Sequence, residues 1–175
     1  TKHAITVSSG TAALHLAVIA LGLKEGDEII VPTLTMMSSI FAPLYEKVVP
    51  VPIDIDEKTY NIDPKLIEAK ITPKTKAIMV VHLFGHPVDM DPVMEIAKKH
   101  NLFVIEDAAE AHGATYKGKM VGSIGDIGCF SMYANKIITT GEGGMVTTNN
   151  DAWAEKIRNT KALSFGKEHK LMHQS

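Results

Sequence analysis

The sequence has one cysteine among its 175 residues, and it has no long apolar run. A single thiol, Cys129, cannot form a disulfide within the chain, and its apolar neighbours predict a buried side chain rather than a reactive one. Neither an apolar run of about eighteen residues, which would predict a membrane span, nor a charged-then-apolar leader is present. These absences predict a cytoplasmic protein in a reducing compartment.

The sequence also lacks an excess of either charge. It has 18 Lys and Arg against 20 Asp and Glu, a formal net charge of −2, and the two signs are interspersed. This pattern is not that of a protein that binds nucleic acid or an acidic membrane surface. An anionic ligand must therefore be bound by a local site. With 45% hydrophobic residues, the chain is long enough to bury one sizeable core.

Strand-like and helix-like segments alternate along the chain. Runs rich in β-branched and aliphatic residues predict strands at residues 4–7, 28–31, 48–53, 77–81, 103–105, 127–131 and 145–148. Helical patterns occupy residues 11–21, 37–45, 64–70, 92–100 and 152–163. Such alternation predicts an α/β three-layer sandwich with a mostly parallel central sheet. In these folds ligands bind at the carboxyl ends of the strands.

The first candidate site is the segment "TVSSGTAALHLA", where a strand runs into Ser8, Ser9, Gly10 and Thr11 and then directly into a helix. Small residues allow a ligand to approach the backbone, and the free amides of a helix start favour a phosphate. The alternative is a simple helix cap by Ser9 or Thr11. The segment is neither the phosphate loop of nucleotide hydrolases nor a dinucleotide fingerprint.

The second candidate is "LFVIEDAAEAHGA", in which a buried strand leads to Glu106 and Asp107. A carboxylate at the carboxyl end of a strand points to where ligands bind, and there it can hold a cationic ring nitrogen. Alternatively, Asp107 caps the segment that follows. His112, a single histidine beside small residues, is interpreted as a packing residue.

The third candidate is Lys136 in "FSMYANKIITTGEGGMVTT", between an apolar run and a glycine-rich turn. Its amine either reaches water or is held for chemistry. A lysine, a phosphate-ready helix start and a strand-end carboxylate are together what an enzyme that uses pyridoxal 5′-phosphate requires. The lysine supplies an amine for a Schiff base, and the carboxylate keeps the pyridine nitrogen protonated.

Five segments resemble, in order, motifs of the DegT/DnrJ/EryC1/StrS family of sugar aminotransferases. They are "SSGTAALHLA", "GDEIIVPTLT", "TKAIMVVHLFGHPVDMD", "VIEDAAEAHGATYKGK" and "FSMYANKIITTGEGGMVTTNND". The resemblance implies the pyridoxal-phosphate-binding large domain of fold type I over residues 1–175. It also implies that an N-terminal segment and a smaller C-terminal domain are missing from this sequence, which begins at Thr1 rather than at Met.

The resemblance implies roles for individual residues. Lys136 is expected to be the Schiff-base lysine, Asp107 to contact the pyridine nitrogen, and Glu110 to lie near the ring hydroxyl of the cofactor. The phosphate is expected at Gly10, Thr11 and Ser131, and Ala12 is a further expected cofactor-binding residue. Met36 is expected over the pyridine ring, where relatives usually place an aromatic residue. A thioether also packs on a ring. Met36 is therefore expected to keep this role, either with a looser orientation of the pyridine ring or with a different resting angle of that ring.

The substrates are implied by the same resemblance. "EDAAEA" and "NKIITTGEGGM" are most similar to members that aminate the 4-keto group of GDP-4-keto-6-deoxymannose. Glutamate is the expected amino donor and a homodimer the expected assembly. The alternatives within the family are another nucleotide-linked keto-sugar, carrying UDP or dTDP and a 3- or 4-keto group, and a sugar 3-dehydratase. The dehydratase replaces the lysine by histidine, so Lys136 argues against it.

Two further alternatives come from other classes. The pairs His82/His86 and His169/His173 have the four-residue spacing of some metal sites. Gly85 and Pro87 argue against a helix at the first pair, and neither pair has a glutamate placed as in a zinc hydrolase, so no metal is expected. The other alternative is a non-catalytic binding fragment of this fold.

Overall fold

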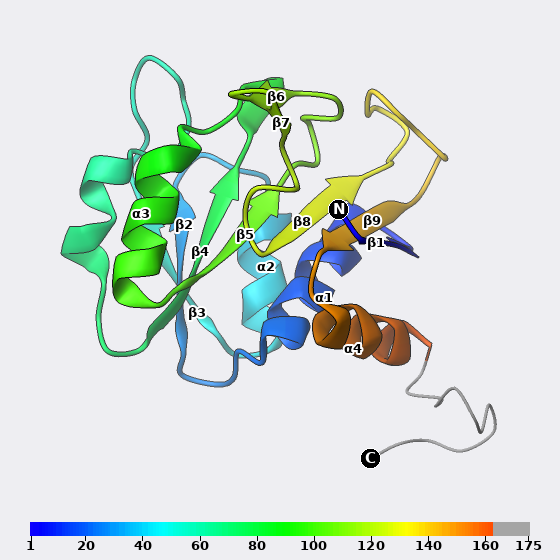
Figure 1. Cartoon of the computed structure of the whole chain (residues 1–175), viewed down its shortest axis with the longest axis horizontal. Coiled ribbons are helices and arrows are strands. Elements are labelled where there is room, and N and C mark those ends of the chain that lie inside the picture. Colours follow the sequence, from blue (N-terminus) through cyan, green and yellow to red (C-terminus); the bar gives the residue numbers. More distant parts are fainter. Residues whose placement is uncertain (163–175) are drawn as a thin grey trace.

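The computed structural model describes residues 1–162, which form a seven-stranded sheet with helices on both faces (Figure 1). The strand order is β1-β9-β8-β5-β4-β2-β3. The strands from β8 to β3 in this order are parallel, whereas β9 and β1 are added to the edge in antiparallel pairs. The strands are β1 (His3–Val7), β2 (Glu28–Pro32), β3 (Val49–Ile53), β4 (Thr75–Val81), β5 (Phe103–Asp107), β8 (Ile127–Ser131) and β9 (Gly144–Thr148).

Helices lie between successive strands, and the last helix follows β9. They are α1 (Gly10–Leu21), α2 (Ser38–Tyr45), α3 (Met90–His100) and α4 (Asp151–Lys161), together with the 3₁₀ turns η1 (Pro64–Leu66), η2 (Glu68–Lys70) and η3 (Leu83–Gly85). A short hairpin of β6 (Thr115–Tyr116) and β7 (Lys119–Met120) lies outside the main sheet. Helix α1 ends at Gly22, which adopts the left-handed conformation at φ 75° that glycine tolerates.

The core is divided by the sheet, because successive residues of a strand point to opposite faces. Ile29, Met79 and Ile105 pack in one apolar cluster with α1, α2 and α4. Ile30 and Val104, next to them in sequence, pack in a second cluster with α3. Both faces are therefore covered, which confirms the predicted three-layer α/β architecture and explains why the parallel strands are apolar throughout.

The structure changes three of the sequence predictions. The helix predicted at 64–70 is a pair of 3₁₀ turns, because its backbone amides bond to the carbonyl three residues earlier, as Ile67 does to Pro64 and Ile71 to Glu68. The strand predicted at 103–105 continues through Asp107. The β6–β7 hairpin was not predicted. The last predicted helix ends at Lys161, and its expected end at residue 163 lies outside the described residues.

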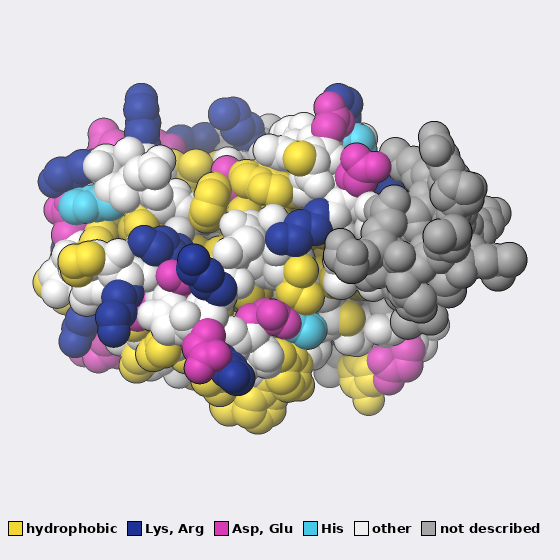
Figure 2. Space-filling model, turned by 90° about the horizontal axis from the view of Figure 1, so that it is seen from below, with side chains coloured by type: hydrophobic (Ala, Val, Ile, Leu, Met, Phe, Trp, Pro, Cys, Tyr) yellow, Lys and Arg dark blue, Asp and Glu magenta, His cyan; other side chains and the backbone are white. Residues whose placement is uncertain are grey.

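The surface agrees with the composition. On the face that Figure 2 shows, basic and acidic side chains are mixed rather than gathered into a field of one sign. The exposed ion pairs of the molecule include Lys99 with Glu68 and Lys47 with Glu25. Among residues 1–162, no helix has the length and apolar character needed to cross a membrane. Cys129 is buried in β8, as predicted, and burial raises the pKa of its thiol.

Candidate functional site

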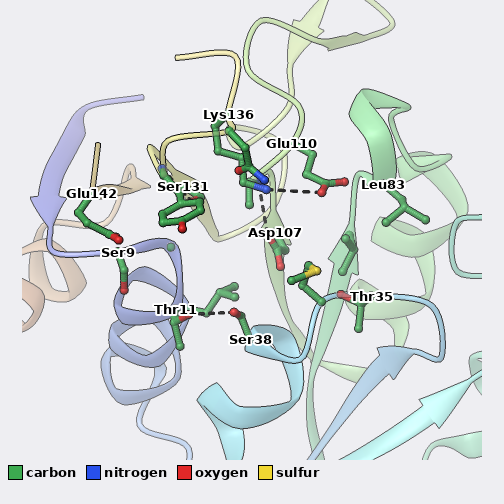
Figure 3. A pocket seen from close by; sticks show the side chains of 17 residues that line it. Ser9, Thr11, Thr35, Ser38, Leu83, Asp107, Glu110, Ser131, Lys136 and Glu142 are labelled. Carbon is green, nitrogen blue, oxygen red and sulfur yellow. Dashed lines mark hydrogen bonds and ion pairs between the residues drawn. The ribbon is translucent and has the colours of Figure 1, made fainter. Parts of the chain in front are cut away.

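A cavity of about 280 Å³ lies at the carboxyl edge of the sheet, between the ends of the parallel strands and the starts of α1 and α2 (Figure 3). It brings together seven of the eight residues expected from the sequence, namely Gly10, Thr11, Met36, Asp107, Glu110, Ser131 and Lys136. Its lining also includes polar residues that sequence reasoning did not assign, namely Thr35, Ser38, Tyr133, Asn135 and Glu142. The fold therefore places these seven residues around one pocket.

The start of α1 forms one wall of this cavity. A Cβ atom on Gly10 would lie 2.7 Å from the Cβ of Ser131, so only glycine lets the helix start approach the end of β8 this closely. Ser9 is the N-cap, and its hydroxyl accepts a hydrogen bond from the amide of Ala12 at 3.1 Å. The first helical amides, at Gly10 and Thr11, have no partner within a helix. Ser9 can thus cap the helix while the amides of Gly10 and Thr11 stay free for a phosphate, so the two interpretations are compatible.

Ala12 is the expected residue that does not line the cavity. Its amide donates to Ser9, and its side chain lies in a shallow depression with Ser8 and Leu16 instead. A contact between Ala12 and a bound cofactor remains a prediction.

Asp107 forms the floor of the cavity at the last position of β5. It is only 5% exposed, and it accepts hydrogen bonds from the Ser39 hydroxyl at 2.8 Å and from the Ala109 amide at 3.1 Å. Burial raises the pKa of Asp107, and these two hydrogen bonds oppose the shift. The bond to Ala109 is the capping role considered as an alternative, and it leaves carboxylate lone pairs facing the cavity.

Lys136 reaches into the cavity from the loop between β8 and β9. Its amine lies 3.5 Å from Glu110 Oε1, and its side chain is 15% exposed (Figure 3). The other oxygen, Glu110 Oε2, accepts a hydrogen bond from the amide of Phe84 at 2.9 Å. Phe84 has a left-handed backbone at φ 52°, a conformation that is uncommon for a bulky residue. Glu110 thus joins the lysine to a turn that follows β4.

Hydroxyl groups connect α1, the segment before α2 and the first turn of α2. Thr11 and Ser38 are hydrogen-bonded at 2.8 Å (Figure 3), and Thr35 and Ser39 are hydrogen-bonded at 2.7 Å. Ser39 in turn donates to Asp107. Sequence analysis missed Thr35, Ser38 and Ser39, although the run of hydroxyl side chains shortly after a buried strand was a signal that could have identified them.

Among the described residues, the histidines show no metal-binding arrangement. Both ring nitrogens of buried His82 are engaged within the protein, by Glu106 and by the Val88 amide, whereas His86 is exposed. The second predicted pair, His169/His173, lies outside the described residues. Within residues 1–162, no group of three potential metal ligands is present. The ring of His112 packs against Phe130 with the centroids 5.4 Å apart, but neither of its buried ring nitrogens has a hydrogen-bond partner in the described part of the chain, so His112 packs without being satisfied.

The residues present fit the three parts of pyridoxal phosphate. Free amides at a helix start suit its phosphate. A buried carboxylate with free lone pairs suits a protonated ring nitrogen, and a sheltered amine suits the carbonyl carbon. Met36 lies on the cavity wall with its side chain free to cover a ring, since the residue is 64% exposed. The cavity can therefore bind a phosphorylated cationic ring that carries an aldehyde.

Comparison with known proteins gives a consistent result. The sequence model of the DegT/DnrJ/EryC1/StrS aminotransferase family matches residues 1–175. The GDP-perosamine synthase of Caulobacter vibrioides is 58% identical over 157 residues, which cover 90% of this chain and 42% of that protein.

Two solved structures are similar as well. The aminotransferase from Psychrobacter cryohalolentis has a TM-score of 0.94 and 48% identity, and the match covers 99% of this chain and 45% of that one. NtdA from Bacillus subtilis, solved with bound cofactor PMP, has a TM-score of 0.92 and 36% identity, with 99% and 39% covered. The chain thus spans less than half the length of these relatives.

Proposed function

Because the chain belongs to the DegT/DnrJ/EryC1/StrS aminotransferase family, we propose that it is the cofactor-binding part of a nucleotide-sugar aminotransferase. The proposed reaction moves an amino group from glutamate to the 4-keto carbon of GDP-4-keto-6-deoxymannose, forming GDP-perosamine. The choice of sugar rests on the similarity to a GDP-perosamine synthase. The choice of glutamate rests on the family resemblance alone.

The observation that carries this proposal is the position of Lys136. Its amine lies in the same cavity as Asp107 and the start of α1, although the three segments are far apart in the sequence. A lysine that only keeps its amine in water would be largely exposed, whereas the side chain of Lys136 is 15% exposed and lines the cavity. We therefore assign Lys136 to the chemistry.

Each wall of the cavity has a proposed task. The amides of Gly10 and Thr11 and the hydroxyl of Ser131 bind the phosphate, aided by the dipole of α1. Asp107 accepts a hydrogen bond from the protonated ring nitrogen, and this cationic partner stabilises the charged form of the buried carboxylate. When bound, pyridoxal phosphate supplies the electron sink that makes the substrate-derived C–H bond acidic.

Lys136 moves the proton. Its amine must be uncharged to attack a carbonyl carbon or to take a proton. Glu110, 3.5 Å away, balances the charge whenever Lys136 Nζ is protonated. Lys136 Nζ can then return the proton at a neighbouring atom, which is the proton shift that transfer of the amino group requires.

We propose a homodimer for the whole protein. In support, large apolar side chains are exposed near the cavity, including Met37, Phe84 and Ile137, which are 53%, 80% and 71% exposed. Such side chains are typical of surfaces that pack against another chain.

Borohydride labelling tests the assignment of Lys136. In the protein incubated with pyridoxal phosphate, reduction is expected to attach the cofactor to the peptide that carries Lys136. The variant Lys136→Ala should lose both the label and turnover, whereas Lys99→Ala, which removes an exposed lysine paired with Glu68, should keep both. A label on another lysine would refute the assignment.

A substrate screen tests the choice of sugar. Amination of the GDP-linked 4-keto sugar with glutamate as donor is the expected result. Amination of only a UDP- or dTDP-linked keto-sugar would keep the enzyme class and overturn the specificity. A labelled Lys136 without amination of any keto-sugar would favour a non-catalytic binding fragment.

A further inference from the structure

The residue before Asp107 is a second buried carboxylate, Glu106, which has no contact with the cavity. The side chains of Ile105 and Asp107 point to the face of the sheet that α1 covers. The side chain of Glu106, between them in sequence, points to the opposite face. The side chain of Glu106 is 0% exposed. A buried charge on the face away from the chemistry requires an explanation, because burying an ion without partners is costly.

The partners of Glu106 account for its full hydrogen-bonding capacity. Oε1 accepts from the amides of Ile124 at 2.7 Å and Gly125 at 2.6 Å. Oε2 accepts from the amide of Gly122 at 2.7 Å and lies 3.0 Å from His82 Nε2. Each oxygen thus accepts two bonds, which is the capacity of a carboxylate oxygen.

The other ring nitrogen of His82 fixes its tautomer. His82 Nδ1 lies 3.0 Å from the amide of Val88 and must accept that hydrogen bond. A nitrogen that accepts carries no proton, so the ring is neutral and Nε2–H donates to Glu106. The negative charge in this cluster therefore belongs to Glu106, and four N–H dipoles stabilise it.

The cluster fastens together three segments that surround Asp107. They are the turn after β4, the end of β5 and the loop before β8. The amide of His82 also donates to the backbone carbonyl of Asp107 at 3.0 Å, and Asp107 pairs with Cys129 of β8 in the sheet. Any displacement of Glu106 is transmitted directly to the backbone that carries Asp107.

We propose that Glu106 is a positioning residue, which holds Asp107 at the height and angle needed to contact the ring nitrogen of pyridoxal phosphate. This inference rests on the proposed function, because it assumes that Asp107 makes that contact. Glu106 touches neither the cofactor nor the reacting atoms.

Only a carboxylate satisfies all the donors. Glutamine at position 106 has one acceptor oxygen, and its NH₂ group would face either the amides of Ile124 and Gly125 or the donors Gly122 and His82. Changing the tautomer of His82 would only move the conflict to Val88. In Glu106→Gln the NH₂ group of the side chain therefore faces N–H donors, although the volume of the side chain is unchanged.

The test compares the affinities of two cofactors. Pyridoxal phosphate has the ring nitrogen, and its 1-deaza analogue has carbon there. The affinity for pyridoxal phosphate divided by the affinity for the analogue therefore measures the contact with Asp107. We expect Glu106→Gln to lower this ratio by about tenfold, the scale on which outer hydrogen-bond partners affect metal ligands. Glu28→Gln is the matched control. Glu28 accepts from the hydroxyls of Thr72 and Thr75 at the opposite edge of the sheet, and its loss should leave the ratio unchanged.

Each outcome is decisive. If Glu106→Gln weakens both cofactors equally, Glu106 has only a structural role and the inference is wrong. If Glu106→Gln does not fold, the same comparison is made with Glu106→Asp, which keeps the charge but shortens its reach, and an unchanged ratio again overturns the inference. Asp107→Asn separates this from the proposed function: if that variant keeps the wild-type ratio, Asp107 does not contact the ring nitrogen.

Discussion

Glu106 and Asp107 are neighbours in sequence, in the same strand, and both are buried, yet their surroundings differ. Four N–H groups surround the carboxylate of Glu106. Asp107 has two donors, Ser39 and Ala109, and its remaining capacity faces the cavity. Burial opposes ionisation of both, but at Glu106 the donation from His82, Gly125 and Gly122 lowers the pKa below its usual range. At Asp107 burial dominates and raises the pKa.

The difference shows how a buried carboxylate becomes either structural or available for binding. A carboxylate whose lone pairs are all used holds the protein together and has nothing to offer a ligand. A buried carboxylate with only some of its acceptor positions occupied is poorly stabilised in its charged form. A cationic ligand stabilises that form when it binds. The sheet separates the two roles by alternating its side chains between faces.

The largest effect is expected from removing the saturated carboxylate. Glu106→Leu should destabilise the protein by about 3 kcal/mol or more, because it leaves several buried donors without an acceptor. Asp107→Leu should cost less, because it strands fewer donors. Urea unfolding of the cofactor-free variants measures both values. A larger loss for Asp107→Leu would reverse the comparison.

The two carboxylates should also affect stability in opposite directions with pH. Glu106 has a lowered pKa in the folded state, so it contributes stability above its usual value of 4.5, which is lost as the pH falls through the lowered pKa. Asp107 has a raised pKa, so it costs stability as the pH rises from 3.8, and the cost is complete above the raised value.

Asp107→Asn should therefore gain stability relative to wild type as the pH rises from acid to neutral. Unfolding free energies of the cofactor-free proteins between these limits measure the difference. A difference between Asp107→Asn and wild type that does not change with pH would contradict the raised pKa.

The smallest effect concerns the opposite wall of the cavity. Met36→Phe should tighten binding of pyridoxal phosphate by about 0.5–1.5 kcal/mol, the value of an aromatic pair beyond burial. Titration of the cofactor measures the change, and Met37→Phe, one position further and outside the cavity lining, is the control. Equal affinities for the two variants would place Met36 away from the ring.

Much of the site could be predicted because parallel strands align their carboxyl ends. Gly10, Asp107 and Lys136 each follow or end a strand-like run, so the fold class alone placed them near one edge. The quoted motifs added the expected roles, which stay predictions until the labelling and affinity measurements test them. Ser39 and Phe84 were missed because their contacts, to Asp107 and Glu110, join segments separated by 68 and 26 residues.

By itself, the sequence determined the layered α/β fold, the family and the edge of the sheet that carries the site. These depend on periodicity and short motifs, which are local properties of the chain. Only the tertiary structure decided that Glu106 faces away from the cavity with all its acceptor positions occupied, and that Glu110 joins Lys136 to the turn at Phe84. These features depend on strand register and on which hydrogen-bond donors are packed next to each carboxylate. The residues adjacent in sequence do not predict either of them.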